Sequence, residues 1–213
     1  MTRSSPRDWA STLADIHRLN AECRAGGPKA LVAFRDLTSR LFCLTVGHRR
    51  ATVHLDRGER PGHGTVAGGH KGEELIRLTN DHYLRFIVSL YVEDQDDVYL
   101  RTNLSVFQYQ LDAEGKDWVF RYDYARDPQE KRHPAAHLHV NAEPRVRGVT
   151  TPRGFARVHF FTGRPTIEST IRLLIEQFGV RANSPAEVWR PALYENEVAF
   201  LDVAHRPLPG ITQ

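Results

Sequence analysis

The chain has 213 residues, of which 40% are hydrophobic and 26% are charged. Both fractions are ordinary for a folded protein, so the composition excludes a chain that is mostly disordered. The formal net charge of +3 is small and the basic residues are spread along the chain, so charge alone gives little support for an anionic partner. The length fits one domain, 1–213, with loose ends at 1–8 and 206–213.

Membrane and export signals are missing from the sequence. No apolar run approaches the roughly 18 residues that a membrane-spanning helix needs. The first residues, MTRSSPRDW, lack the apolar centre of a signal peptide. Two cysteines, Cys23 and Cys43, are too few for a disulfide framework or a four-thiolate zinc site. We therefore expect a cytoplasmic protein with no membrane partner.

The N-terminal part predicts two helices. Trp9, Leu13 and Ile16 recur at helical spacing, which predicts a helix over 8–24 that ends at Gly26-Gly27. The same spacing continues over 29–45, where β-branched residues near the end leave a strand as the alternative.

A glycine-rich segment follows at 57–72. Six glycines in this segment predict a flexible surface loop. The order His70-Lys71-Gly72 does not fit a phosphate-binding loop, which needs Gly-Lys followed by Ser or Thr.

The middle of the chain predicts an antiparallel sheet. β-Branched and aromatic residues dominate several segments that are separated by short, turn-like sequences. We expect about five strands, over 82–93, 98–112, 117–125, 136–142 and 156–161.

The C-terminal part returns to helices. Ile167, Ile171 and Leu174 share a face of one predicted helix. Ser184 and Glu187 form a capping box that starts a second helix, which Pro191 is expected to interrupt early. Helices, then strands, then helices indicate an α+β fold whose sheet is flanked by N-terminal and C-terminal helices.

Alternation along the strands gathers polar side chains on one face. Arg121 and Asp123 point to the same side of their strand, and His137, His139 and Asn141 share a face of the next one. By the same rule Arg157 and His159 share a face. If these strands are neighbours, one wall of the sheet holds three histidines with one or two arginines.

Such a wall suits two kinds of chemistry. Histidines can be the acid and the base in RNA cleavage without a metal, and arginine can stabilise the charged phosphoryl oxygens. The expected catalytic residues are His137, His139, His159 and Arg121, with Arg157, Tyr122 and Asn141 binding substrate. Alternatively, His137, His139, Glu143 and His159 hold a divalent metal. An exposed strand with a plain Arg121–Asp123 ion pair is the structural alternative.

The stretch WVFRYDYARDPQEKRHPAAHLH resembles the signature of the TumE-like toxins of bacterial toxin–antitoxin systems, within about residues 82–140. Phe120, Arg121, Tyr122 and Asp123 match the Phe-Arg-Tyr-Asp part of that signature. His133, His137 and His139 approximate its histidine cluster, whereas Tyr124 stands where the family tends to have asparagine. The resemblance implies a β-rich toxin fold, RNA as substrate and a cognate antitoxin as partner.

A second stretch is similar to the metal-binding motifs of the cupins. It comprises His137-x-His139-x3-Glu143 and then Pro152-x-Gly154 with His159, although the glycine before the first motif is missing. This resemblance implies a bound divalent metal.

Three functions follow as hypotheses. The first is a toxin-like, phosphodiester-cleaving enzyme that acts on RNA without a cofactor. The second is a cupin-like metal protein, and the third is a non-enzymatic interaction module of a toxin–antitoxin or defence system.

Overall fold

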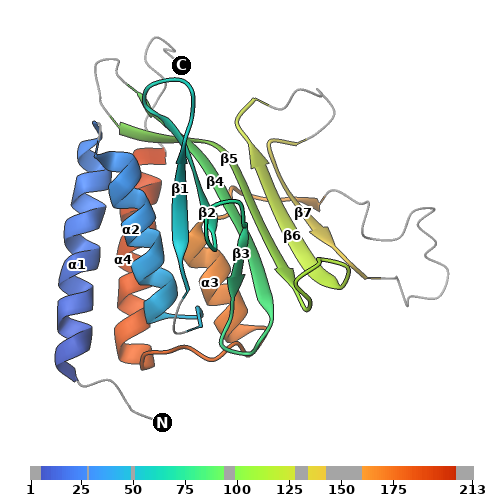
Figure 1. Ribbon diagram of the computed structural model, residues 1–213. Coiled ribbons are helices and arrows are strands. Elements are labelled where there is room, and N and C mark those ends of the chain that lie inside the picture. Colours follow the sequence, from blue (N-terminus) through green and yellow to red (C-terminus); the bar gives the residue numbers. More distant parts are fainter. Residues whose placement is uncertain are drawn as a thin grey trace.

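One antiparallel β-sheet with helices packed on one of its faces makes up the described part of the chain (Figure 1). The structure is a computed structural model that describes residues 6–27, 29–48, 51–93, 99–127, 134–142 and 160–204. The described helices are α1 (Pro6–Ala25), α2 (Ala30–Leu44), α3 (Ile167–Glu176) and α4 (Ala186–Ala204). The described strands are β1 (Val53–Arg57), β2 (His63–Gly68), β3 (Leu75–Arg77), β4 (Tyr83–Glu93), β5 (Tyr99–Gln110), β6 (Trp118–Ala125), β7 (Ala136–Val140) and β8 (Phe160–Phe161). The α+β class expected from the sequence is confirmed.

The sheet has the order β1-β2-β4-β5-β6-β7-β8, and β3 pairs with β4 beside this path. The strands at 82–93, 98–112, 117–125 and 136–142 are found close to their expected bounds. Of the strand expected at 156–161, only its last two residues are described, and they form β8. The expectation of about five strands is wrong, because β1, β2 and β3 precede them.

The glycines at 57–72 do not make a loop of the whole segment, since β2 runs through it. A side chain on Gly64 would place its Cβ 2.9 Å from Leu55 Cδ1, and one on Gly68 would lie 2.7 Å from Ile76 Cγ1. Glycine at these positions therefore allows β2 to pack closely against its neighbours. Composition alone does not distinguish this use of glycine from loop flexibility.

Aromatic side chains fill the space between the sheet and the helices. Phe86 is fully buried at the centre, with its ring 5.3 Å from that of Phe42 on α2 and 5.7 Å from that of Phe107 on β5. Because side chains alternate along a strand, the residues between the buried ones on β4, β5 and β6 face away from the helices. The packing of the core therefore determines which residues of β4, β5 and β6 lie on the sheet face away from the helices.

The helix ends differ from expectation at several positions. Helix α1 begins at Pro6, two residues earlier than predicted. Helix α4 continues through Pro191 to Ala204, so the predicted interruption is wrong. Proline there removes a single backbone hydrogen bond near the start of the helix. The Ser184 hydroxyl donates to the carbonyl of Leu44 (2.9 Å), so Ser184 fastens the start of α4 to the end of α2.

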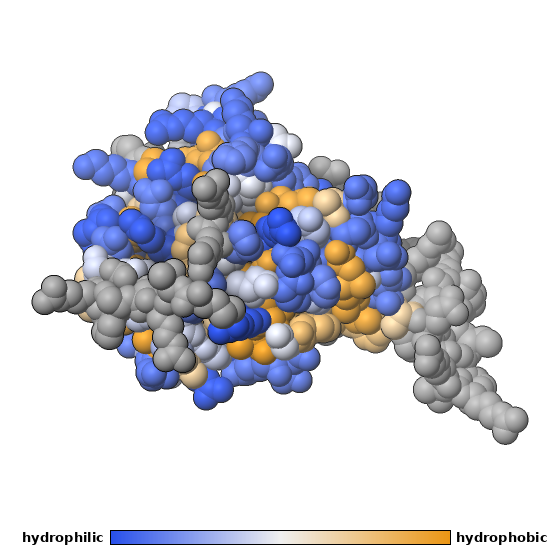
Figure 2. All heavy atoms as spheres, turned by 60° about the horizontal axis from the view of Figure 1, so that its bottom comes forward, coloured by the Kyte–Doolittle hydropathy of each residue, from blue (hydrophilic) through white to orange (hydrophobic). Residues whose placement is uncertain are grey.

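The exposed apolar side chains are scattered. Figure 2 shows hydrophobic patches lying between hydrophilic side chains on the face in view. None of the described helices is long and apolar enough to cross a membrane. The large hydrophobic side chains that remain exposed in the described part of the chain are Leu111, Phe160, Phe178, Tyr194 and Val198. They come from four different parts of the chain and do not mark one continuous element.

A buried polar network joins the helices to one another. The side-chain amide of Asn20 on α1 donates to Asn196 on α4, whose own amide donates to the carboxyl of Glu168 on α3. Glu168 is fully surrounded by protein, and this burial raises the pKa of its carboxyl group. The folded protein therefore favours the neutral form of Glu168.

This network predicts a specific dependence of stability on pH. The raised pKa of Glu168 contributes stability below the pKa of an unfolded glutamate, and that contribution is lost as the pH rises through the folded-state pKa. Between pH 5 and pH 8, the stability difference should therefore move in favour of Glu168→Gln by on the order of 1 kcal/mol. Urea unfolding measures this difference, with Glu59→Gln at an exposed position as the control. Parallel pH profiles for Glu168→Gln and the unsubstituted protein would contradict it.

Candidate functional site

The pairing of β6 with β7 brings four polar side chains to one place on the sheet. Asp123 lies directly opposite His137, and Arg121 lies directly opposite His139. All four side chains line one hollow on the sheet face away from the helices. The structure thus brings together Arg121, His137 and His139 as the strand alternation predicted.

Asp123 is the point on which the two imidazoles converge. Its Oδ2 atom lies 3.8 Å from Nε2 of His137 and 3.6 Å from Nε2 of His139. One ligand atom from each of the three residues lies within 4.8 Å of the others. The side chains are largely shielded, with exposed fractions of 12% for His137, 16% for His139 and 17% for Asp123. Two nitrogens and one oxygen therefore surround a small common space.

The backbone orients one of these imidazoles. Nδ1 of His137 lies 3.1 Å from the carbonyl oxygen of Pro134. A neutral imidazole that donates to this carbonyl has its unprotonated Nε2 facing Asp123. A lone pair and a carboxylate oxygen face each other favourably only when a cation or a proton lies between them. A carbonyl that accepts from the far nitrogen is also the usual partner of a metal-binding histidine.

Arg121 balances the charge of Asp123. Its Nε lies 2.9 Å from Oδ1 and 2.8 Å from Oδ2 of that carboxylate. The described residues give its two Nη nitrogens no acceptor, and 38% of the side chain is exposed. Arg121 therefore keeps donors for an anionic group that enters the hollow.

The hollow itself has a volume of about 880 Å³. Its floor continues from β6 onto β5 through Gln108 and Gln110, which are both buried although they are polar. The Gln108 amide donates to Gln110 (2.8 Å), and the Gln110 amide donates to the carbonyl of Asp112 (2.8 Å). Trp118 contributes an aromatic surface at the same end. The hollow thus offers amides and one large ring beside the Asp–His–His cluster.

The sequence contains signals for Gln108, Gln110 and Asp123 that the analysis of single strands does not use. Gln108 and Gln110 alternate with the aromatic residues Phe107 and Tyr109 at the end of β5, and this alternation marks a polar face. Asp123 was expected only as an ion-pair partner of Arg121, and the metal hypothesis took its carboxylate from Glu143 instead. Only the pairing register of β6 with β7 shows that Asp123 faces His137.

Two predicted site residues lie elsewhere. Tyr122 is on the helix side of β6, where its ring lies 5.6 Å from that of Phe120. Burial raises the pKa of the Tyr122 hydroxyl, which suits a packing residue. Asn141 is exposed, and its side-chain amide donates to the carbonyl of Trp118 (2.8 Å). Neither side chain lines the hollow, so their assignment to substrate binding is not supported.

The remaining predicted site residues are His159, Arg157 and Glu143, with His133 from the toxin-like stretch. All four lie outside the described residues. Cys23 lies outside the hollow, and burial raises the pKa of its thiol to about 12, which leaves it protonated at neutral pH.

No protein-family model matches the chain, and no curated protein or solved structure matches it. The likeness to the TumE-like toxins therefore stays a prediction from the sequence.

The cluster predicts stoichiometric metal binding. Protein prepared without a histidine tag should bind close to one Zn²⁺ or Mn²⁺ per chain in isothermal titration calorimetry. Since loss of even an outer partner of a metal ligand weakens binding about 10- to 100-fold, Asp123→Asn and His137→Ala should weaken it at least as much.

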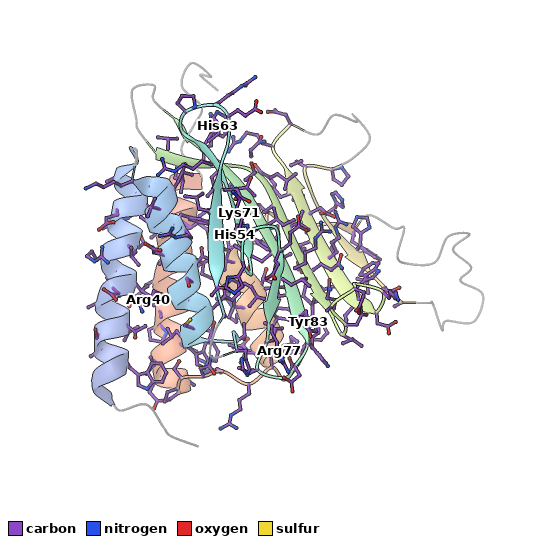
Figure 3. The ribbon with its side chains drawn as sticks, in the orientation of Figure 1. Arg40, His54, His63, Lys71, Arg77 and Tyr83 are labelled. Atoms are coloured by element: carbon purple, nitrogen blue, oxygen red, sulfur yellow. The ribbon has the colours of Figure 1, made fainter. Side chains whose placement is uncertain are left out.

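A matched control is available at the far end of the sheet. His63 is exposed and lies at the first residue of β2 (Figure 3). Strands β4 and β5 separate β2 from β6, so His63 is well away from the cluster. His63→Ala should leave the affinity unchanged. Equal affinities of the Asp123→Asn variant and the unsubstituted protein would show that the ion binds elsewhere.

Proposed function

We propose that the protein cleaves phosphodiester bonds of RNA at a divalent metal ion held by Asp123, His137 and His139. The observation that supports this function best is the convergence of two imidazole nitrogens and one carboxylate oxygen within 4.8 Å. The partly exposed guanidinium of Arg121 beside them and a hollow large enough for a nucleotide add to it.

The donor set favours a transition metal. Imidazole and carboxylate together suit Zn²⁺, Mn²⁺ or Fe²⁺, whereas Mg²⁺ prefers oxygen ligands alone. Three protein ligands leave positions for water and substrate, which is the pattern of catalytic and not of structural sites. The metal alternative drawn from the sequence is thereby kept in part: His137 and His139 stay ligands, and Asp123 supplies the carboxylate in place of Glu143.

Arg121 defines the place of the phosphate. Its Nη nitrogens can donate to a phosphoryl oxygen while its Nε stays on Asp123. A metal ion at the cluster would stabilise charge on the same phosphoryl group and activate a bound water or hydroxyl. His137 and His139 are then ligands, and not the acid and base that the sequence led us to expect.

The hollow suits a nucleotide. Its volume of about 880 Å³ lies within the range of roughly 300–1,000 Å³ found for ligand sites. Trp118 offers a ring on which a base can stack, and the amides of Gln108 and Gln110 can bind its polar edge. The choice of RNA draws on the TumE-like stretch, which also implies a cognate antitoxin as a protein partner. The cytoplasmic location that we propose rests instead on the export and membrane signals that the sequence lacks.

A second candidate is cleavage without metal. The ion pair of Arg121 with Asp123 at 2.8 Å favours it, because the carboxylate is already neutralised by a cation of the protein. In that case His137 and His139 are the general acid and base. The two candidates differ in their response to a chelator.

Cleavage of a short fluorescent RNA tests the proposal. We expect cleavage that is abolished by a chelator and restored by Zn²⁺ or Mn²⁺. Asp123→Asn and His139→Ala should lower the rate by about 100-fold or more, since each removes a ligand of the ion. His63→Ala should cleave at the rate of the unsubstituted protein.

Each outcome separates the alternatives. Cleavage that survives the chelator but is lost in His137→Ala supports the metal-free candidate and contradicts the metal-dependent one. Cleavage that is equal in all variants identifies a contaminating nuclease. Metal binding at the cluster without any cleavage contradicts the nuclease function and leaves a metal protein of another kind.

A further inference from the structure

A second cavity lies on the other side of the sheet, between β4, β5, the helices α1, α2 and α4 and the start of α3. Its wall is mostly apolar, and Phe34, Leu37, Val88 and Phe107 contribute to it. The volume of this cavity is about 70 Å³. It shares no residue with the hollow at β6 and β7, so the two are independent sites.

Arg164 lines this apolar pocket at the end where Phe200 lies. Its guanidinium carbon lies 4.6 Å from the ring centre of Tyr124 on β6 and 4.7 Å from that of Phe200 on α4. Both distances are within the range of cation–π contacts. In the described part of the chain, no carboxylate or carbonyl accepts a hydrogen bond from it. Among the described residues, the contacts of this cation are therefore with aromatic rings and not with an anion.

A second arginine makes this end more positive. Burial lowers the pKa of Arg164, and the nearby charge of Arg126 lowers it as well. Nε of Arg126 donates to the carbonyl of Thr102 (3.1 Å), and Thr102 itself lines the pocket. Two cations thus lie near this end of the pocket, and an anion bound there would be attracted by both.

Glu168 lines the pocket but does not supply this anion. Its buried carboxyl accepts a hydrogen bond from Asn196, and burial raises its pKa, which favours the neutral form. Asn196 lies one helical turn before Phe200 on α4, so Glu168 and Arg164 are both near this end of the pocket. A neutral carboxyl group can donate a hydrogen bond to a bound carboxylate.

We propose that this pocket binds a short-chain monocarboxylate, with its hydrocarbon chain among the apolar side chains and its carboxylate on Arg164. The size of the cavity sets the length of the chain. A cavity of about 150 Å³ holds the six-carbon ring of benzene, so about 70 Å³ holds a hydrocarbon chain of roughly three carbons. The carboxylate and the two arginines are complementary in charge.

Butyrate is the probe and butyramide is its matched control. The two have the same shape, but only butyrate carries a negative charge. Saturation-transfer NMR on the unsubstituted protein should show saturable binding of butyrate, about tenfold tighter than that of butyramide, because charge-assisted hydrogen bonds are worth more than neutral ones. Equal binding of the two compounds, or no saturable binding of butyrate, would overturn the proposal. This comparison needs no variant.

Variants then locate the site. Arg164→Gln should reduce the affinity for butyrate to that for butyramide, whereas Arg57→Gln at the exposed end of β1 should change neither. Ala199→Phe, which fills the pocket, should abolish binding of both compounds. Circular dichroism confirms that each variant is folded. Full butyrate binding by a folded Arg164→Gln variant would place the carboxylate elsewhere and overturn the assignment.

Discussion

The register between β6 and β7 is the constraint on which the candidate site depends. Asp123 faces His137 and Arg121 faces His139 because these strands pair at those positions. A slip of one residue would turn both histidines toward the helices and remove the cluster. On the opposite face, Phe120 is buried in the core and packs with its strand neighbours. Apolar packing on one side of the sheet therefore fixes the geometry of the polar site on the other.

The polar face of the sheet lowers the stability of the fold unless its buried groups are hydrogen-bonded, so its presence points to a functional role. Burying amides such as those of Gln108 and Gln110 costs free energy unless their hydrogen bonds are made. Here they bond to each other and to the backbone, which keeps them in place beside the Asp–His–His cluster. Sequences depart from a plain apolar or solvated pattern mainly where function requires it. The apolar pocket departs from this pattern as well, because the cation of Arg164 lies beside a hydrophobic cavity.

Periodicity predicted those parts of the molecule where one side of an element is buried. The strands at 82–93 and 117–125 and the face shared by His137 and His139 follow from alternation alone. The prediction of a loop over the whole of 57–72 is wrong, because the sequence does not distinguish a glycine that allows close packing from a glycine in a flexible turn. The role of Asp123 was missed for another reason. The contact of Asp123 with His137 depends on the pairing register of β6 and β7, and a single sequence predicts such a register only weakly.

X-ray absorption spectroscopy of the zinc-loaded protein tests directly whether His137 and His139 are ligands, since it counts the imidazoles bound to the ion. We expect one zinc per chain with at least two imidazole ligands, and one imidazole fewer in His137→Ala. A protein that holds no zinc, or a zinc ion with the same imidazole count in both proteins, would contradict a metal site at Asp123, His137 and His139.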